Sequence, residues 1–506
     1  MKNGRKMIDE QHGDETQGAK EGGEIKGLSG AMKNIGKDWK SGGVVLLFCG
    51  MLAACSTVGG YRRPEVQLPD SYRRLQRTSG KAADSSIAAI PYSRFFSDPA
   101  LVALIDSSVE HNYDLLIALK NIEYARQSLG AARLGILPTL NAEASAGVSK
   151  PSKNSLGDQS SGGKPVEDYT LALSSSWEID IWGKIQDRKR SALAEYLRSK
   201  EAARAVRTRL VADVAQGYYN LQMLDVQLGV TRRNAALADT TLQMMRLQYE
   251  AGRVTGLAVQ QQESRLQAVR LSIPKIEESV VMQENALAAL TGRMPGPVGR
   301  TTGPASVAGS DSLLAGVPAA LLQNRPDVRA AEASLMAKHA AVGTAKAQFY
   351  PSFTITARGG LNAFRSSDWF SMPGSVFRLV EGAVLQPLFR RGELVAQYEQ
   401  SRIQRDQAEL SFKQALLTAV GEVSDALVRL DKTRRQESIS DQRVATLRTS
   451  VKNARLLFQS GMATYLEVIT AQSDLLQAEL EQVDIRRQRL SAMAGLYRSL
   501  GGGWRE

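Results

Sequence analysis

Two kinds of hydrophobic pattern follow one another along the chain, and each predicts a different element. Residues 139–149 and 168–181 alternate between apolar and polar side chains, which predicts two β-strands joined by a long polar loop. From residue 184 to residue 250 the apolar positions recur in steps of four and three, the pattern of a helix packed along a coiled-coil seam. A turn at 252–256 and a returning helix follow. We therefore expect a mixed α+β chain with long helices.

This strand–strand–helix–helix unit occurs twice. Tyr249–Gly252 corresponds to Phe458–Gly461 at an offset of 209 residues, whereas Leu137-Pro138 corresponds to Tyr350-Pro351 at an offset of 213. Offsets held over such distances indicate a duplication. The change from 213 to 209 means that the first unit carries four extra residues, which we place in the Ser/Gly-rich stretch 149–165.

The lengths of the expected elements bear on how the chain meets a membrane. The second pair of strands is expected at 352–362 and 376–388, and strands of about 9–11 residues can cross a bilayer. A helix over 184–250 would extend about 100 Å, about three times the hydrocarbon core of a bilayer. Four strands cannot close into a barrel, and lipid does not tolerate an open sheet edge. Strands in a membrane would therefore require oligomerisation; a small periplasmic sheet capped by helices is the alternative.

Composition and charge exclude several classes of function. The chain has 64 Lys+Arg against 52 Asp+Glu, a net charge of +12, but the basic residues are mixed with acidic ones. This pattern favours solvated helix faces over a nucleic-acid surface. Two Cys, and three His that lie far apart, predict neither a disulfide scaffold nor a His- or Cys-ligated metal site. The sequence contains no phosphate loop and no nucleophile–base pair, so none of its motifs suggests catalysis.

The N-terminal part has the features of a secretion signal. An apolar run of eleven residues, 44–54, follows a basic stretch, and it is too short to span a bilayer. The run ends in Leu52-Ala53-Ala54-Cys55, which resembles a bacterial lipobox, so we expect Cys55 to be lipidated. The alternative is a buried cysteine in a short core helix. Ser56, rather than Asp, favours an outer-membrane destination, and Met32 is a possible true start.

These features predict five segments along the chain. They are an N-terminal extension and lipoprotein signal peptide (1–54), a lipidated N-terminal segment (55–100), a first repeat (101–292), a Gly/Pro/Ser-rich linker (293–318) and a second repeat (319–506).

Five motifs then stand in order on the duplicated frame. They are Trp177–Gly183, Leu290–Gly296, Asn324–Glu332, Gly461–Val468 and Leu500–Trp504. Together with the lipobox and the duplication, they resemble the TolC-like outer-membrane efflux factors, in particular the lipoprotein branch that serves tripartite pumps of the RND type. The resemblance covers essentially the whole chain after Cys55.

The resemblance implies a fold and a function. Three chains would form a homotrimer with a twelve-stranded outer-membrane β-barrel, continued by a long α-helical barrel across the periplasm. The expected function is a passive exit duct for small molecules, which works with a periplasmic adaptor protein and an inner-membrane pump. Such a duct is lipid-anchored in the cell outer membrane, is not an enzyme, and needs no cofactor besides the lipid on Cys55. The alternative is a lipid-anchored periplasmic coiled-coil scaffold or adaptor, although an adaptor would normally show one hairpin, not two full units.

The resemblance also implies adaptor-docking sites at the two helix turns. A glycine at such a turn is what any helix C-terminus would use, so only exposed flanking side chains would make a docking surface. The residues that match the docking tips are Gly252, Arg253, Val254, Thr255 and Leu257 in the first turn, and Gly461, Met462, Ala463, Thr464 and Tyr465 in the second.

A gate is implied just after the second turn, where family members narrow the tip with a leucine and carboxylates. Leu466 matches the leucine and Glu467 matches one carboxylate, whereas the other position is Thr470. Three copies of Glu467 would form a ring that attracts cations; a simple solvated helix residue is the alternative. Asn324 is expected to cap the helix that begins near Pro326, which makes that motif structural.

Overall fold

The computed structural model describes residues 59–69, 72, 86–150, 152, 154, 164–301 and 318–505, all within one compact unit of residues 54–506. Cys55, the expected signal peptide and most of the expected linker lie outside the described residues. The elements in chain order are η1 (Ile87–Ala89), α2 (Tyr92–Phe95), α3 (Pro99–His111), α4 (Tyr113–Leu134), β1 (Thr139–Ser149), β2 (Val166–Ile179), α6 (Lys184–Glu250), α7 (Gly256–Leu290), η2 (Pro318–Ala320), α8 (Leu321–Asn324), α9 (Pro326–Ala347), β3 (Ser352–Ala363), η3 (Ser366–Asp368), β4 (Val376–Leu385), α10 (Glu393–Gln459) and α11 (Tyr465–Ser499).

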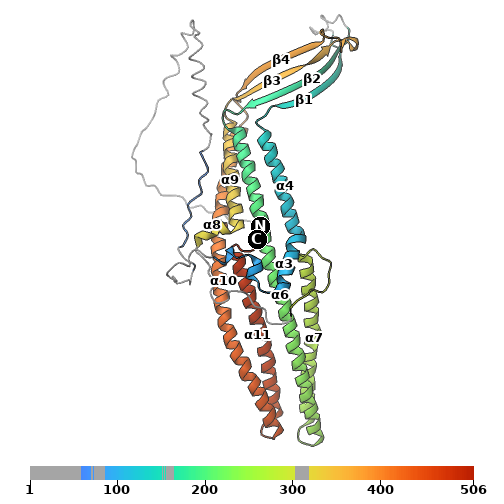
Figure 1. Cartoon of the computed structure of the whole chain (residues 1–506), viewed down its shortest axis with the longest axis vertical. Coiled ribbons are helices and arrows are strands. Elements are labelled where there is room, and N and C mark those ends of the chain that lie inside the picture. Colours follow the sequence, from blue (N-terminus) through green and yellow to red (C-terminus); the bar gives the residue numbers. More distant parts are fainter. Residues whose placement is uncertain are drawn as a thin grey trace, which may run out of the picture. The chain divides into compact units, whose positions relative to one another are not determined.

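The four strands form one antiparallel sheet in the order β1-β2-β3-β4. Within this unit, the sheet lies at one end of the helices, and the α6–α7 and α10–α11 hairpins turn at the other end (Figure 1). Two strands end earlier than the sequence predicted. β2 stops at Ile179 because Asp180 accepts hydrogen bonds from amides of α6. β4 stops at Leu385, two residues before Pro387, which has no N–H for a sheet hydrogen bond.

The duplication is present in the fold. α6 and α10 have 67 residues each and begin 209 residues apart, and α7 and α11 have 35 residues each at the same offset. α4 and α9 have 22 residues each and begin 213 residues apart. The connection between β1 and β2 (150–165) is four residues longer than that between β3 and β4 (364–375), as the change of offset predicted.

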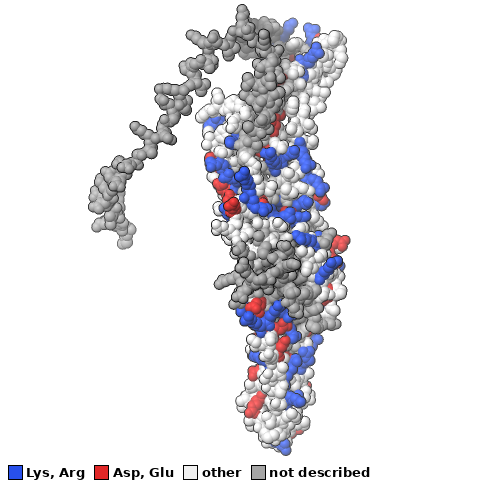
Figure 2. Space-filling view, turned by 60° about the vertical axis from the view of Figure 1, so that its left-hand side comes forward, with Lys and Arg blue, Asp and Glu red and all other residues white. Residues whose placement is uncertain are grey.

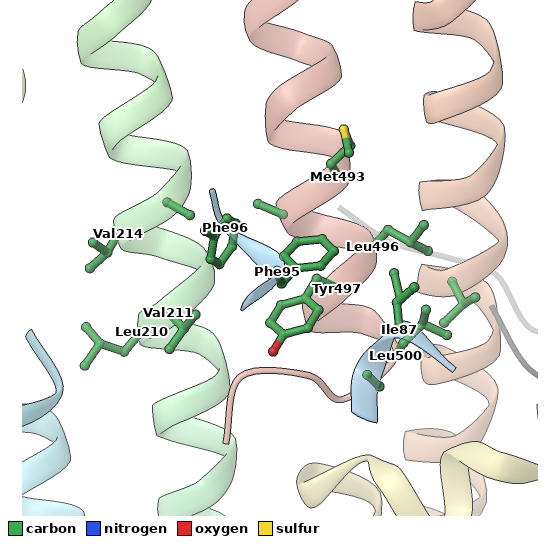
Figure 3. Packing of buried hydrophobic residues seen from close by; sticks show 14 of the residues in the cluster. Ile87, Phe95, Phe96, Leu210, Val211, Val214, Met493, Leu496, Tyr497 and Leu500 are labelled. Atoms are coloured by element: carbon green, nitrogen blue, oxygen red, sulfur yellow. The ribbon is translucent and has the colours of Figure 1, made fainter. Parts of the chain in front are cut away.

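The largest hydrophobic cluster joins the two repeats near the middle of the helices. Figure 3 shows Phe95 and Phe96, from the segment before α3, between α6 and α11. The ring of Phe95 stacks on Tyr497 with centroids 4.2 Å apart, and the Tyr497 hydroxyl donates to the Ile90 carbonyl at 2.6 Å. Val211 and Val214 of α6 complete this side of the cluster. The core therefore fixes α6 of the first repeat against α11 of the second.

The predicted cap of α9 is wrong. Asn112 caps α4 by accepting from the Leu115 amide at 3.0 Å, and the residue 213 positions later is Arg325, not Asn324. Arg325 makes no side-chain cap; it is buried and donates to Asp327, Glu422 and the Ser499 carbonyl. In the second repeat an ion pair thus replaces the cap of the first.

Candidate functional site

The strand register gives the sheet a mainly apolar and a mainly polar face, because side chains alternate across a strand. The exceptions include Glu167, Ser175 and Arg378 on the first face, and Phe377, Leu379 and Leu385 on the second. The apolar face carries Leu140, Ala142, Ala144, Ala146, Val148, Tyr169, Leu171, Leu173, Trp177, Ile355, Leu361, Val376, Val380 and Val384. The polar face carries Asn141, Glu143, Ser145, Asp168, Thr170, Ser174, Ser176, Thr356, Arg358, Asn362 and Glu381. Such a sheet can separate an apolar environment from an aqueous one.

Polar contacts cross the strands on the second face. Arg358 of β3 forms an ion pair with Glu143 of β1 at 2.7 Å, reaching over β2. Asn362 donates to Asp168 at 2.6 Å and to the Thr170 hydroxyl at 2.9 Å. The polar groups of this face thus bond to one another.

The junction of sheet and helices is built by the Trp177–Gly183 motif. Asp180 accepts hydrogen bonds from the Ile185 and Gln186 amides at 3.1 and 2.8 Å, which satisfies free amides at the start of α6. Gly183 adopts the left-handed conformation at φ 75° that turns the chain into the helix. The Trp182 indole donates to the Pro351 carbonyl at 2.7 Å, which ties the first repeat to the second.

The two hairpin tips have the same backbone turn. Gly252 and Gly461 are left-handed, at φ 70° and 78°. The amides of Arg253 and Met462 donate back to the Gln248 and Leu457 carbonyls, each at 2.8 Å. This is the hydrogen bonding of a glycine-terminated helix, so the two glycines have a structural role.

The second tip differs from the first in its helix cap. Thr255 accepts from the Ala258 amide, whereas Thr464 forms a full capping box with Glu467. The Glu467 carboxylate accepts from the Thr464 amide at 2.6 Å. The carboxylate of the expected gate is therefore bound by the N-terminus of its own helix.

The side chains expected at the docking tips and gate divide into an exposed set and a half-buried set. The exposed residues are Gly252, Arg253, Thr255, Leu257, Gly461, Met462, Thr464, Leu466, Glu467 and Thr470. Val254, Ala463 and Tyr465 are half-buried. Val254 and Tyr465 pack on a small cluster of Met245, Phe458 and Val468, which joins the two tips.

Sequence reasoning missed a partly buried polar network that holds residues 300–301 of the expected linker. Asp98 accepts from the Tyr218 hydroxyl and the Thr301 hydroxyl, each at 2.7 Å. Arg300 forms ion pairs with Asp225 and Glu284 beside it. These partners lie 75 or more residues apart except for Arg300 and Glu284, so no local pattern connects them. The capping box, by contrast, was readable as Thr464-x-x-Glu467.

Comparison with known proteins agrees with this architecture. The outer membrane efflux protein family matches residues 104–293 and 317–502. The solvent efflux pump outer membrane protein SrpC of Pseudomonas putida is 30% identical over 460 residues, which cover 90% of this chain and 96% of that protein. The cation efflux system protein CusC of Escherichia coli K12 is 28% identical over 462 residues, which cover 91% and 99%.

Solved structures show the same fold. A membrane protein from Pseudomonas aeruginosa superposes with a TM-score of 0.81 at 28% identity and covers 89% of this chain and 98% of its own. A crystal structure of CusC gives a TM-score of 0.78 at 26% identity and covers 88% and 99%. The family match takes in both repeats, and the fold agrees along nearly the whole length of these proteins. The chain therefore belongs to the outer membrane efflux protein family and is an outer-membrane efflux channel.

Proposed function

We propose that three copies of this chain form the passive exit duct of a tripartite efflux system. In this assembly the strands make a twelve-stranded barrel in the outer membrane, and the helices make a tunnel that extends into the periplasm. A periplasmic adaptor and an inner-membrane pump deliver the cargo, a lipid on Cys55 anchors each copy, and the chain itself catalyses no reaction.

The sheet supports closure between copies. β1 and β4 are its two edges, they run in opposite directions, and among the described residues each is paired on one side only. A further copy can therefore continue the antiparallel order without a break. The apolar face would meet lipid and the polar face would line the lumen, as in other outer-membrane barrels.

The helices support a periplasmic tunnel. Among the described residues, no helix combines the length and the hydropathy needed to cross a bilayer. Figure 2 shows many lysines and arginines over the helices and fewer toward the end of the molecule that carries the sheet, where some lie at the far end. Because charged residues are costly in lipid, this distribution supports placing the sheet in the membrane and the helices outside it.

The hairpin tips are proposed as the adaptor-docking sites. Met462 and Leu257 are large apolar side chains exposed at the tips, and Arg253 adds a positive charge to the first tip. The half-buried Val254 and Tyr465 would act indirectly, by fixing the two turns against each other through the cluster beneath them.

The gate is proposed at Leu466 and Glu467. Leu466 is exposed at the first turn of α11, so three copies can approach one another there. The capping box holds each Glu467 carboxylate in one place and would define a ring of three negative charges. Thr470 lies one turn further on and supplies a hydroxyl rather than a second carboxylate.

The cargo is proposed only as small molecules selected by the pump. One relative is named for solvent efflux and another for cation efflux, and this chain is about equally similar to both. Their names therefore do not favour one cargo class.

The observation that carries the proposal is the duplicated fold with two free, oppositely directed sheet edges. The test is negative-stain electron microscopy of the protein extracted with detergent from an outer-membrane fraction. Hollow three-fold particles with a tubular extension are expected. Monomeric or solid particles, or absence from that fraction, would instead favour the periplasmic scaffold.

A further inference from the structure

Two charged residues lie on the apolar face of the sheet, both near the strand ends that point away from the helices (Figure 1). Glu167 is the second residue of β2, and Arg378 is the third residue of β4. From these two positions to the ends that lead into the helices, the described strands carry no charged residue on this face. The uncharged band suits the core of a bilayer, and the two charges lie at one of its borders.

Arg378 has no counter-ion on this face. Its side chain is exposed and, among the described residues, makes no ion pair or hydrogen bond. Glu167 lies three residue pairs further out along the sheet, about 20 Å away at 3.3 Å per residue. By contrast, Arg358 of the polar face is paired with Glu143 at 2.7 Å.

A further copy of the chain would not supply the missing charge either. In the proposed barrel, β1 of another copy would lie beside β4. The residues of β1 on the apolar face are a leucine, three alanines and a valine, and its one carboxylate, Glu143, is on the polar face. A counter-ion for Arg378 must therefore come from outside the protein.

The surface beside Arg378 is bare backbone. Its partner across the ladder is Gly359, where a Cβ would meet nothing closer than the Phe377 carbonyl oxygen at 3.5 Å. The next residue along the same row is Leu173, which is 57% exposed. The guanidinium thus borders a smooth apolar strip against which a hydrocarbon chain can pack.

Aromatic residues of the β3–β4 connection fold over the same face. The Trp369 ring lies 5.4 Å from Tyr169, which belongs to the apolar face, and 5.1 Å from the exposed Phe370. Tryptophan and tyrosine favour the interface between hydrocarbon and headgroups. Exposed Lys164 and Arg365 stand at this end of the sheet as well, and Figure 2 shows some basic residues at the far end. These residues place a headgroup layer close to the start of β4.

We propose that Arg378 binds the phosphate of an outer-leaflet lipid, one of whose acyl chains lies along Gly359 and Leu173. The inference rests on the proposed function, which puts the apolar face of the sheet in the membrane. It adds a ligand class to that face: a phosphorylated lipid rather than a neutral one.

The chemistry of arginine fits this ligand. A guanidinium offers two parallel N–H donors that match two phosphate oxygens. An arginine on the lipid-facing side of a barrel is costly at the middle of the bilayer and nearly free of cost at its border. Arg378 stands about 7 Å along the strand from the first residue of β4, and its long side chain spans that distance to the headgroups.

Native mass spectrometry of the full-length protein, exchanged into lipid-free detergent, provides the test. The probes are phosphatidic acid and a diacylglycerol with the same acyl chains, which differ by the phosphate alone. Arg378→Gln removes the charge, and Arg378→Lys keeps it. Arg358→Gln is the matched control, because it removes an arginine from the opposite face of the neighbouring strand.

The wild type is expected to bind phosphatidic acid about tenfold more tightly than Arg378→Gln does, since that is about the contribution of one charge-assisted hydrogen bond. Arg378→Lys should keep most of this advantage, Arg358→Gln should bind as the wild type does, and the diacylglycerol should not distinguish the four proteins. Equal binding of phosphatidic acid by the wild type and Arg378→Gln would overturn the site. An equal loss in Arg358→Gln would overturn it too, since the effect would then belong to the charge of the whole barrel.

Two further measurements separate the possible sources of failure. Inorganic phosphate at millimolar concentration should not displace phosphatidic acid; displacement would overturn the lipid as the ligand in favour of a free anion. A wild type that binds both lipids equally would overturn the site without any variant. If negative-stain micrographs of that same sample show hollow trimers, the proposed duct stands and the lipid site alone is lost. Without hollow trimers, the duct is lost as well.

Discussion

Two glycines with the same backbone conformation differ in what surrounds them, and this difference predicts two different losses of stability. Gly501 follows α11 at φ 87°, and Gly461 follows α10 at φ 78°. A Cβ at Gly501 would stand 2.4 Å from the Asn324 carbonyl oxygen and 3.0 Å from the Arg325 amide nitrogen, both backbone atoms. A Cβ at Gly461 would have no neighbour within 4 Å in the part of the chain that the structure describes.

The magnitudes follow from these geometries. A left-handed alanine costs about 1–2 kcal/mol, and both variants incur this cost. Gly501→Ala must also move backbone against a packed neighbour, and overpacking adds about 1–3 kcal/mol. We therefore expect a loss of about 1–2 kcal/mol for Gly461→Ala and about 2–5 kcal/mol for Gly501→Ala.

The assay is urea unfolding of the full-length protein in detergent, followed by the circular dichroism of its helices. The midpoint and slope give the change in free energy of unfolding for each variant. Gly461→Ala is the matched control, because it makes the same substitution at nearly the same φ. Equal losses, or a larger loss for Gly461→Ala, would refute the argument that the backbone of Asn324 limits the space at Gly501.

Three further predictions concern lipidation, the gate and pH. Cys55→Ala should abolish lipidation; mass spectrometry that still finds fatty acid at the N-terminus would contradict the lipobox. Leu466→Ser with Glu467→Ser should open the resting tip and raise the single-channel conductance, and an unchanged conductance would count against the gate. Burial opposes the charge on Asp327, but the hydrogen bonds and charge of Arg325 outweigh it and lower the pKa of that carboxyl below 3.8. The Arg325–Asp327 pair therefore contributes stability above about pH 3.8, which is lost as pH falls through the lower folded pKa. The stability gap between wild type and Arg325→Met should narrow across that range, and a gap independent of pH would refute this account.

Much of the fold was predictable because its signals are local. Alternation and four–three spacing depend only on neighbouring residues, and these patterns predicted the long helices and, within a few residues, the strands. The errors in the strand ends and in the cap of α9 have physical causes that the spacing of apolar residues does not reveal. Pro387 ends a strand although the apolar pattern continues to Leu388, and Arg325 occupies a cap position because an ion pair to Glu422 replaces the cap.

The candidate site was less predictable, because its function depends on which side chains remain exposed. The sequence indicated both hairpin turns but not that Val254 and Tyr465 would pack on one cluster. It also left the role of Glu467 open between a gate and a solvated residue; the structure adds a third role, as part of a helix cap. A cap and a charged ring are compatible, since the cap fixes the position of the carboxylate.

Comparison of the two repeats position by position separates residues required by the fold from residues available for assembly. Gly292 and Gly501 show a position at which both repeats require the same residue, because each ends a helix against a backbone carbonyl at the corresponding place. Where one copy of the position is buried within the chain and the other is exposed, the residues differ, as with Glu201 and Leu410. A surface that was simply solvated should have gained polar residues at the exposed copy, yet it gained leucine. The direction of that change at Leu410 supports the proposed assembly, in which another copy rather than water would cover this side chain.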